Sequence, residues 1–427
     1  MTEAFLQYVW RYQLLEGPLI TTEGQPVHVS RAGELNTDAG PDFFYARIEI
    51  GGVEWSGNVE IHVKASDWRL HKHQQDHAYD NVVLHVVYDA DEVVATAEGR
   101  KLPTLSLQSH IPSSLWDNYE LLLHPPKNIA IPCVPTLVSL PSFKVTSYME
   151  RLVVERIERK TMEVRRLLKE AHGGWEQCCY WLMGHYFGGK TNAFPFELLV
   201  KATDMRLLAR WKDNPQRLEA LLMGQAGFLE AYFDDEYPRQ LQSDYQALRA
   251  GSHLTPISSH LWKFFRLRPS GFPTLRISQF SQLVSRSTNL FSKLLETPDA
   301  DRLMSFFDVT ASPYWNTHYQ FDKPSRPCVK SVGRSFAQSL IINAWIPMLF
   351  EYGATHGEQQ MKDRALELLH QLPPEENKIV HLWKELGVSV PDAAASQALI
   401  QLYNEYCTSH RCLQCHIGYH VLKSKAQ

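Results

Sequence analysis

The sequence lacks any apolar run long enough to cross a membrane. No stretch approaches the roughly 18 uninterrupted apolar residues that a spanning helix needs. Residues 1–17 also lack the basic start and the small-residue cleavage site of a signal peptide, and they carry Glu3 instead. We therefore expect a cytoplasmic protein with no membrane partner.

An excess of charge of one sign is missing too. The 43 Lys and Arg residues against 47 Asp and Glu give a formal net charge of −4. The overall charge therefore gives no argument for nucleic acid, and any site for a polyanion has to be a local patch. The length of 427 residues predicts two or three domains.

Cysteine is scarce, with seven residues in the whole chain. In a cytoplasmic protein these are more typical of thiols, metal ligands or catalytic groups than of disulfides. Cys407, Cys412 and Cys415 have the spacing C-x4-C-x2-C. Because two thiolates two residues apart can chelate one tetrahedral ion, this trio predicts a metal site.

The trio needs a fourth ligand. His416 is adjacent to Cys415 and poorly placed for the same ion, whereas Cys133 lies at the end of the first region of the chain. We expect Cys133 and the trio to hold Zn²⁺ or a [4Fe–4S] cluster, since both take four thiolates. Such a closed site is structural, and the alternative is a set of unconnected surface thiols.

The residue pattern changes from extended to helical along the chain. Residues 3–16 predict an amphipathic helix, β-rich runs follow it, and Gly51-Gly52 predicts a hairpin turn between two of these runs. Beyond the proline-rich break at 124–135, mixed charges with helical periodicity predominate. The prediction is an α/β domain over residues 1–125, a mostly α-helical domain over 140–400, and a Cys-rich segment over 401–427 that packs back near Cys133.

The segment VEIHVK at 59–64 places polar residues in alternate positions of a predicted strand. Glu60, His62 and Lys64 point to one face because the side-chain period of a strand is two, and the aliphatic residues between them take the other face. Upstream, Asp42 in GPDF precedes a strand and lies 18 residues before Glu60.

Two carboxylates on neighbouring strands suit Mg²⁺ or Mn²⁺, which prefer oxygen ligands. An imidazole or amine beside such an ion can activate a water molecule. Asp42 and Glu60 are therefore candidate metal ligands for phosphodiester hydrolysis, with His62 or Lys64 acting on the water. The alternative is an ordinary surface strand whose outer face carries charges.

GPDF at 40–43 and VEIHVK at 59–64 resemble the PD-(D/E)xK nuclease superfamily, whose core is a helix, a three-stranded meander, a helix and another strand. The resemblance covers roughly residues 1–100. It implies a restriction-endonuclease-like core in which Asp42 and Glu60 bind the metal and DNA is the substrate. His62 stands in the family's lysine position, and Lys64 follows on the same face.

The resemblance also implies supporting side chains from two flanking segments. The family often takes an acid from its first helix, for which Glu16 is the closest candidate and Glu3 the next. It often takes polar groups from the helix after the motif, where this chain has Gln75, Asp76 and Tyr79.

Histidines gather in the same region and allow another interpretation. His71 and His73, with Asp76, could bind Zn²⁺ or another 3d metal, because imidazole and carboxylate suit these ions. The two rings share a face only if the segment is extended, whereas in a helix His73 and His77 share one. His85, inside VVLHVV, is expected to be buried and to face the same site.

Most of the chain is also similar to a bacterial family known as a domain of unknown function. LNTDAGPDF, GNVEIHVKASDW and CTSHRCLQCHIG are among the segments that carry this resemblance. It implies a grouping without an activity. The sequence thus favours a metal-dependent nuclease acting on DNA, and the alternative is a non-catalytic nucleic-acid-binding or scaffold protein with a structural cysteine–metal site.

Overall fold

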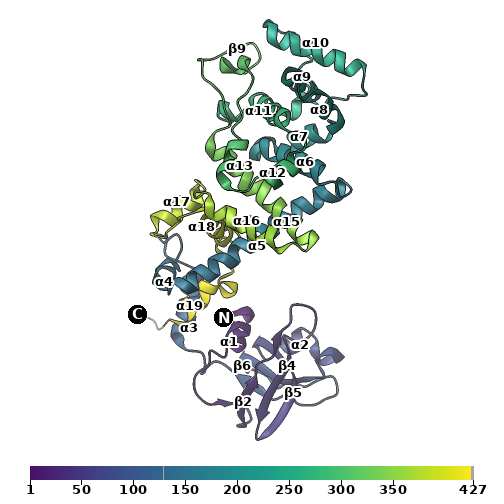
Figure 1. Ribbon diagram of the computed structural model, residues 1–427. Helices are drawn as coiled ribbons and strands as arrows, with labels where there is room; N and C mark the ends of the chain where they lie inside the picture. Colours follow the sequence, from purple (N-terminus) through teal and green to yellow (C-terminus); the bar gives the residue numbers. More distant parts are fainter. Residues whose placement is uncertain (128, 425–427) are drawn as a thin grey trace. The chain divides into compact units, whose positions relative to one another are not determined.

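The computed structural model describes residues 1–127 and 129–424, and the chain divides into two compact units (Figure 1). The first comprises residues 1–140 and the chain from 404 onward, and the second comprises residues 141–403. The first is built around a β-sheet and the second is mostly α-helical, which confirms the predicted change from α/β to helical structure. Among the described residues, no helix combines the length and the apolar character needed to span a bilayer.

The sheet of the first unit begins antiparallel and ends parallel. Its strands are β1 (Leu19–Ile20), β2 (Pro26–Arg31), β3 (Glu34–Leu35), β4 (Phe43–Ile50), β5 (Val53–Lys64), β6 (Val82–Asp89) and β7 (Thr104–Ser106). Neighbours follow the order β1-β2-β4-β5-β6-β7, and β3 pairs with β4. The pairs up to β5 are antiparallel, whereas β6 runs parallel to β5 and β7 parallel to β6.

Strands β4 and β5 form the hairpin predicted at Gly51-Gly52. Ile50 pairs with Val53, and the two glycines between them have φ values of 60° and 83°. Positive φ at both central residues is typical of the type I′ turn, whose twist matches that of the flanking strands. Glycine adopts this conformation without a steric penalty, so the prediction is confirmed.

Helix α1 (Glu3–Arg11) packs on one face of this sheet. The Thr2 hydroxyl accepts a hydrogen bond from the Phe5 N–H and caps the helix. Leu6 and Trp10 are fully buried in a core that includes aliphatic side chains of β4, β5 and β6. The apolar face of α1 therefore anchors it to the hairpin, as its amphipathic sequence predicts.

The first helix is shorter than the predicted span of 3–16. Gln13 has a φ of 47°. Its N–H donates to the Trp10 carbonyl at 3.1 Å, and the Leu14 N–H donates to the Val9 carbonyl at 3.0 Å. These two bonds define a Schellman motif, which ends the helix. Glutamine rather than glycine occupies the left-handed position, so the end is not visible in the sequence.

The opposite face of β5 is covered by α2 (Asp67–Leu70) and by the 3-10 turns η1 (His73–Gln75) and η2 (His77–Tyr79). Trp68 and Tyr79 from this segment form a second core cluster with Val82. The Trp68 ring lies edge-on to His62, with 6.5 Å between the ring centroids. The histidine-rich segment is therefore folded over the polar face of β5.

The end of the chain returns to the first unit. Helix α19 (His416–Lys423) packs against α3 (Ser113–Leu123) and α4 (Val134–Ser139). The Asn118 Nδ2 group donates to the carbonyls of Val421 and Ser424 at 3.1 and 2.9 Å. The C-terminal cysteines are therefore held beside Cys133, which directly precedes α4.

The second unit is organised around the long helix α5 (Ser142–Glu170), along which α15 and α18 pack. Its other elements are α6 (Trp175–Phe187), α7 (Gly189–Lys201), α8 (Met205–Trp211), α9 (Pro215–Gln225), α10 (Glu236–Ala250), α11 (Pro273–Arg286), α12 (Leu290–Glu296), α13 (Ala300–Phe306), α14 (Arg334–Leu340), α15 (Ile346–His356), α16 (Gln359–Gln371), α17 (Lys378–Glu385), α18 (Ala393–Gln401) and the strand pair β8 (His318–Gln320) and β9 (Lys323–Pro324).

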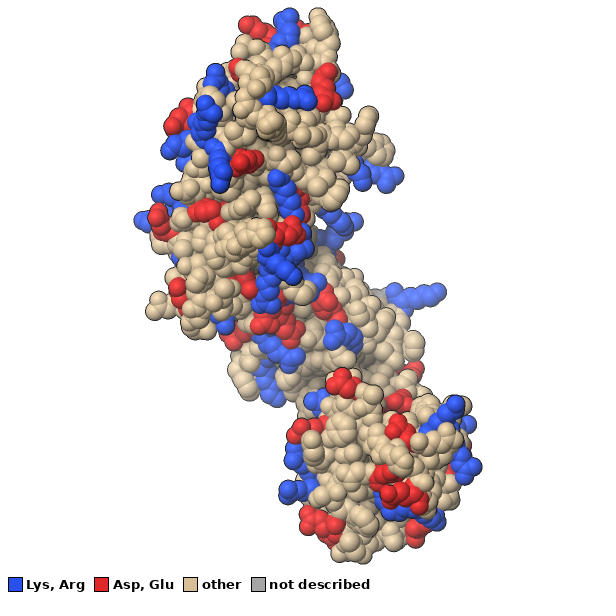
Figure 2. Space-filling model, turned by 90° about the vertical axis from the view of Figure 1, so that its right-hand side faces the viewer, with Lys and Arg blue, Asp and Glu red and all other residues tan. Residues whose placement is uncertain are grey.

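Charged side chains of both signs intermingle on the face shown in Figure 2. This agrees with the nearly balanced totals of 43 basic and 47 acidic residues. Neither sign of charge therefore dominates this face.

Candidate functional site

The register of the central hairpin brings two remote acids together. Phe43 of β4 pairs with Val59 of β5, so Asp42, one residue before Phe43, comes level with Glu60. The Asp42 N–H donates to Glu60 Oε2 at 3.0 Å, and the Ile61 N–H donates to Asp42 Oδ2 at 2.9 Å. Each carboxylate therefore bonds to the backbone beside the other.

Glu60 and His62 are buried, with 5% and 1% of their surfaces exposed. The polar face of β5 is therefore not a solvated surface at these positions. Lys64, two residues further on, is exposed where the strand leaves the core, and its N–H donates to Asp67 Oδ2 at 3.0 Å. The structure thus brings His62 to the acid pair and leaves Lys64 outside it.

The two carboxylates crowd each other in a poorly solvated place. Burial, followed by the charge of Glu60, raises the pKa of Asp42 well above its usual range, although the Ile61 N–H opposes this shift. Burial likewise raises the pKa of Glu60, and the charge of Glu3 adds to the increase. Two such carboxylates cannot both ionise at low cost without a positive charge nearby.

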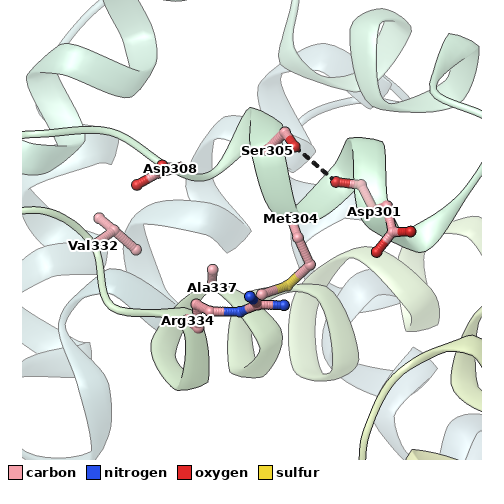
Figure 3. A pocket seen from close by; sticks show the side chains of 7 residues that line it. All are labelled: Asp301, Met304, Ser305, Asp308, Val332, Arg334 and Ala337. Atoms are coloured by element: carbon pink, nitrogen blue, oxygen red, sulfur yellow. Dashed lines mark hydrogen bonds between the residues drawn. The ribbon is translucent and has the colours of Figure 1, made fainter.

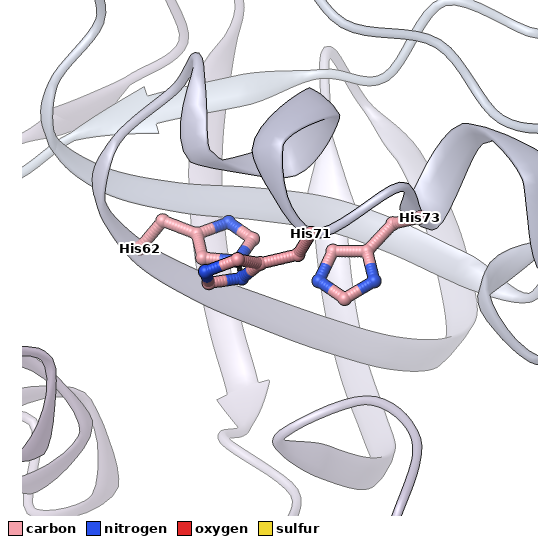
Figure 4. Close-up of side chains that lie close together, drawn as sticks. All are labelled: His62, His71 and His73. Atoms are coloured by element: carbon pink, nitrogen blue, oxygen red, sulfur yellow. Dashed lines mark hydrogen bonds between the residues drawn. The ribbon is translucent and has the colours of Figure 1, made fainter.

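Histidines adjoin Glu60 on the same face of the sheet, and Figure 4 shows three of their rings close together. The nitrogens of His62, His71 and His73 that could bind a metal lie within 4.8 Å of one another. Glu60 Oε1 is 3.4 Å from His62 Nε2 and 3.3 Å from His73 Nε2. Behind them, His85 Nε2 lies 2.9 Å from His62 Nδ1. The expectation that His85 is buried and faces the site agrees with this geometry.

The buried histidines are held in the neutral form. Burial, helped by His85 and the other nearby histidines, lowers the pKa of His62 to about 2. Burial lowers the pKa of His85 to about 3 and also lowers that of His73. Neutral imidazole keeps one nitrogen lone pair, which is the form that binds metal ions. His73 Nε2 is in addition a buried nitrogen without a hydrogen-bond partner.

The first helix contributes residues other than the leading sequence candidate. Glu16 lies beyond the end of α1, and its N–H donates to the His110 carbonyl at 2.8 Å. Glu3, in the first turn of α1, lies near the histidines: burial raises its pKa, and the charges of His71 and His73 oppose that increase. The structure therefore brings Glu3, rather than Glu16, to the acid pair.

Gln7 is a site residue that the sequence interpretation missed. Its Nε2 donates to Asp42 Oδ1 at 2.8 Å and lies 3.5 Å from Glu3 Oε1. Gln7 follows Glu3 by four residues, so the two share the polar face of α1. The spacing of Glu3 and Gln7 is visible in the sequence. It points to the acid pair only once α1 is known to lie over the hairpin.

The polar residues after β5 have different roles. Tyr79 stacks on His73 with 3.8 Å between the ring centroids, and it therefore supports a histidine of the cluster. Asp76 instead caps a turn, because its Oδ1 accepts from the Ala78 N–H at 2.9 Å. Gln75 is exposed in η1. The Asp76 carboxylate is therefore engaged in its own turn. The carboxylate that lies against the histidines is that of Glu60, whereas the sequence interpretation had placed Asp76 there.

The four predicted cysteine ligands are neighbours within the first unit. Burial, followed by the charges of Cys415 and Cys412, raises the pKa of Cys133 to about 12. Burial, followed by Cys133, Cys415 and Cys412, raises the pKa of Cys407. These mutual effects place Cys133 near the trio, although more than 270 positions separate it from Cys407 in the sequence.

The cysteines occupy chain turns at the ends of short elements. Cys133 directly precedes α4 and Cys415 directly precedes α19, while Cys412 opens the 3-10 turn η8 (Cys412–Gln414). A Cβ on Gly418 would lie 2.1 Å from the Cys412 carbonyl oxygen, so only glycine permits this approach of η8 to α19. The close packing fixes the turn that carries the C-x2-C pair.

The helical unit has a cavity and a cluster of titratable side chains, and neither contains a buried pair of carboxylates like Asp42 and Glu60. The cavity has a volume of about 260 Å³, and its charged residues are all exposed (Figure 3). The Ser305 hydroxyl donates to the Asp301 carbonyl there at 2.9 Å. The cavity is lined by Asp301, Met304, Ser305, Asp308, Val332, Arg334 and Ala337.

The cluster consists of Glu163, His185 and Glu197. Although burial raises the pKa of Glu197, hydrogen bonds from Lys201, Arg166 and His185 lower it to about 2. Side-chain cations therefore already neutralise this carboxylate. The contrast with Asp42 and Glu60 is clear, since neither of those forms an ion pair with Lys or Arg in the part of the chain that the structure describes.

The comparisons with known proteins give a family and no activity. The family model described as "Protein of unknown function (DUF2851)" matches residues 3–378. This range includes the acid pair, the histidines and Cys133, and it ends before Cys407. None of the curated proteins matches the chain, and none of the solved structures does.

Proposed function

The chain belongs to the DUF2851 family, and we propose that it is a metal-dependent nuclease that hydrolyses phosphodiester bonds, with DNA as its substrate. The observation that carries the proposal is the buried pair Asp42 and Glu60, whose carboxylates lie side by side without a Lys or Arg partner among the described residues. A divalent cation would supply the missing positive charge.

The residues present fit such a cation. Asp42 and Glu60 offer carboxylate oxygens, the ligands that Mg²⁺ and Mn²⁺ prefer. A bound ion would stabilise the negative charge that develops on the phosphate and would favour ionisation of an attacking water. Gln7 and the Ile61 N–H each donate to one oxygen of Asp42, and the Asp42 N–H donates to Glu60 Oε2. Both carboxylates are therefore oriented before any ion binds.

The order of secondary-structure elements also supports the proposal. A helix is followed by the antiparallel strands β2, β4 and β5, by a short helical segment, and then by the parallel strand β6. This is the order expected of the PD-(D/E)xK core. The departure is the second helix, which is reduced here to α2 and two 3-10 turns.

The test is cleavage of DNA by the purified chain in the presence of Mg²⁺ or Mn²⁺. We expect cleavage that stops when EDTA removes the ion, and single-stranded DNA, double-stranded DNA and RNA as parallel substrates identify the preferred polymer. If no substrate is cut with either ion, the nuclease proposal fails and the non-catalytic binding or scaffold function is favoured.

His62 and Lys64 give a second, sharper test of the same site. His62 is buried beside Glu60, whereas Lys64 is exposed beyond the end of the core. We expect His62→Ala to lower the cleavage rate by roughly 10–100-fold, the cost of removing a group that adjoins and orients a metal ligand. Lys64→Ala should leave the rate near the wild-type value. A large loss with Lys64→Ala and none with His62→Ala would reverse the assignment.

The four cysteines are given a structural role in the same proposal. Cys133, Cys407, Cys412 and Cys415 would hold Zn²⁺ or a [4Fe–4S] cluster that ties the end of the chain to α4. The mutual effects of their thiols on each other's pKa support this assignment. Four thiolates fill a tetrahedral site and leave no position for a substrate, so this metal would stabilise the unit and take no part in hydrolysis.

A further inference from the structure

We propose that His62, His71, His73 and Glu60 form a second cation site, which binds a divalent first-row transition metal such as Zn²⁺. This inference deepens the proposed nuclease function, because Glu60 also belongs to the acid pair. It concerns a donor set different from the pair of carboxylates, and its occupancy can be measured without any turnover.

The spacing of the four donor atoms fits tetrahedral coordination. Ligands held 2.0–2.1 Å from one Zn²⁺ ion in a tetrahedron lie roughly 3.3 Å from each other. His62 Nε2 is 3.2 Å from His71 Nδ1 and 3.4 Å from Glu60 Oε1. Glu60 Oε1 is 3.3 Å from His73 Nε2. Three edges of the required tetrahedron are therefore already near their ideal lengths.

A residue in the left-handed backbone conformation turns the rings of His71 and His73 toward that of His62. Lys72, between His71 and His73, has a φ of 64°. Lysine rarely adopts this conformation, and such backbone strain is concentrated at functional sites. The turn directs both flanking imidazoles toward His62 on β5 (Figure 4). The chain thus brings the two rings of an H-x-H motif to one point without being extended.

The contacts around the donors turn the metal-binding nitrogens toward one another: His62 Nε2 lies within hydrogen-bond distance of His71 Nδ1, and a bound ion would replace this contact. His85 lies 2.9 Å from His62 Nδ1, so the second nitrogen of that ring is anchored and Nε2 faces the cluster. A partner on the outer nitrogen commonly orients a metal-ligating histidine. His73 is 8% exposed, yet its Nε2 has no hydrogen-bond partner. A metal ion would satisfy this nitrogen.

The donor types favour a transition metal over Mg²⁺ at this position. Imidazole suits Zn²⁺ and its neighbours in the first row, whereas Mg²⁺ is bound mainly through oxygen. The two oxygens of Glu60 have different neighbours. Oε2 accepts a hydrogen bond from the Asp42 N–H, and Oε1 faces the histidines. His71 is exposed, so an ion can reach the site from solvent past this ring.

Titration of the metal-stripped full-length chain with Co²⁺ tests the site, because tetrahedral Co²⁺ has a visible d–d absorption that reports its ligands. Co²⁺ at the histidine site lacks the near-ultraviolet thiolate-to-metal band that Co²⁺ at the cysteine site would give, so the two sites are distinguished. We expect an absorption band that Zn²⁺ displaces. His71→Ala and His73→Ala should each weaken Co²⁺ binding by roughly 10²-fold or more, since even outer partners of a metal ligand contribute 10–100-fold. Because His71 is exposed, its replacement should not disturb folding.

The matched control is His77→Ala, an exposed histidine of the same segment that hydrogen-bonds to Asp80. It should bind Co²⁺ like the wild type. Wild-type affinity in both His71→Ala and His73→Ala would overturn the proposal. Asp42→Asn separates the two proposals: it should lose DNA cleavage and keep Co²⁺ binding, so a failure of the nuclease assay alone leaves the histidine site standing.

Discussion

Asp42→Asn is expected to abolish metal-dependent DNA cleavage and to leave the fold intact. Asparagine has the same shape and can still accept the Ile61 N–H bond that Asp42 Oδ2 now receives at 2.9 Å. It has no charge to hold the cation. We expect a loss of at least about 10²–10³-fold in kcat/KM, the cost of removing one preorganised electrostatic group. Initial rates at saturating Mg²⁺ and Mn²⁺ measure it.

The same substitution should not destabilise the metal-free protein. It removes one of two carboxylates that repel each other in a buried place, where burial and the charge of Glu60 already raise the pKa of Asp42. We therefore expect a Tm in EDTA at or above that of the wild type. The matched control is Asp38→Asn, in the same loop but exposed, which should keep full activity. Equal cleavage by wild type and Asp42→Asn would mean that the activity comes from elsewhere.

Cys412→Ser is expected to release the structural metal and to loosen the end of the chain. Structural Zn²⁺ sites contribute about 10–16 kcal/mol of apparent binding free energy in small domains, so losing one ligand should cost more than the ~1 kcal/mol of an average substitution. Cys412 is only partly buried. Its replacement by serine therefore changes little packing, and the loss of stability reports mainly on the metal.

Elemental analysis and the absorption spectrum of anaerobically purified protein give the metal content and so test this prediction. Zinc is colourless, whereas an iron–sulfur cluster is brown. Guanidinium unfolding, compared with the wild type, gives the change in stability. Cys328→Ser, at an exposed position of the second unit, is the control and should alter neither quantity. A wild-type protein without bound metal, or unchanged metal content in Cys412→Ser, would exclude the site.

The hairpin shows which part of the candidate site was predictable from the sequence. Gly51-Gly52 fixes a tight turn, and the turn fixes the register of β4 against β5. This register alone would place Asp42 opposite Ile61. A bulge between Phe43 and Ala46, where Tyr45 has a φ of 59°, shifts the pairing by one residue and brings Asp42 level with Glu60. The spacing of 18 residues therefore predicts that the two acids lie close together, whereas their exact pairing depends on a bulge that the sequence does not mark.

The contributions of α1 and of the histidine segment were not predictable in the same way. Glu3 and Gln7 reach the acids because α1 packs across the hairpin, and the helix ends early because Gln13 adopts a left-handed conformation. His71 and His73 converge because Lys72 does the same. Neither residue is one that normally marks such a turn, so tertiary packing imposes both conformations.

The sequence by itself determined the elements whose causes are local. These are the alternation of side chains along β5, the glycine turn, the change from sheet to helices, and the chelating spacing of Cys412 and Cys415. Only the tertiary structure decided which donors meet. It buried Glu60 and His62, left Lys64 outside, replaced Glu16 by Glu3, and brought Cys133 to the C-terminal trio. Such meetings depend on packing between segments remote in the chain, and periodicity within one segment carries no information about them.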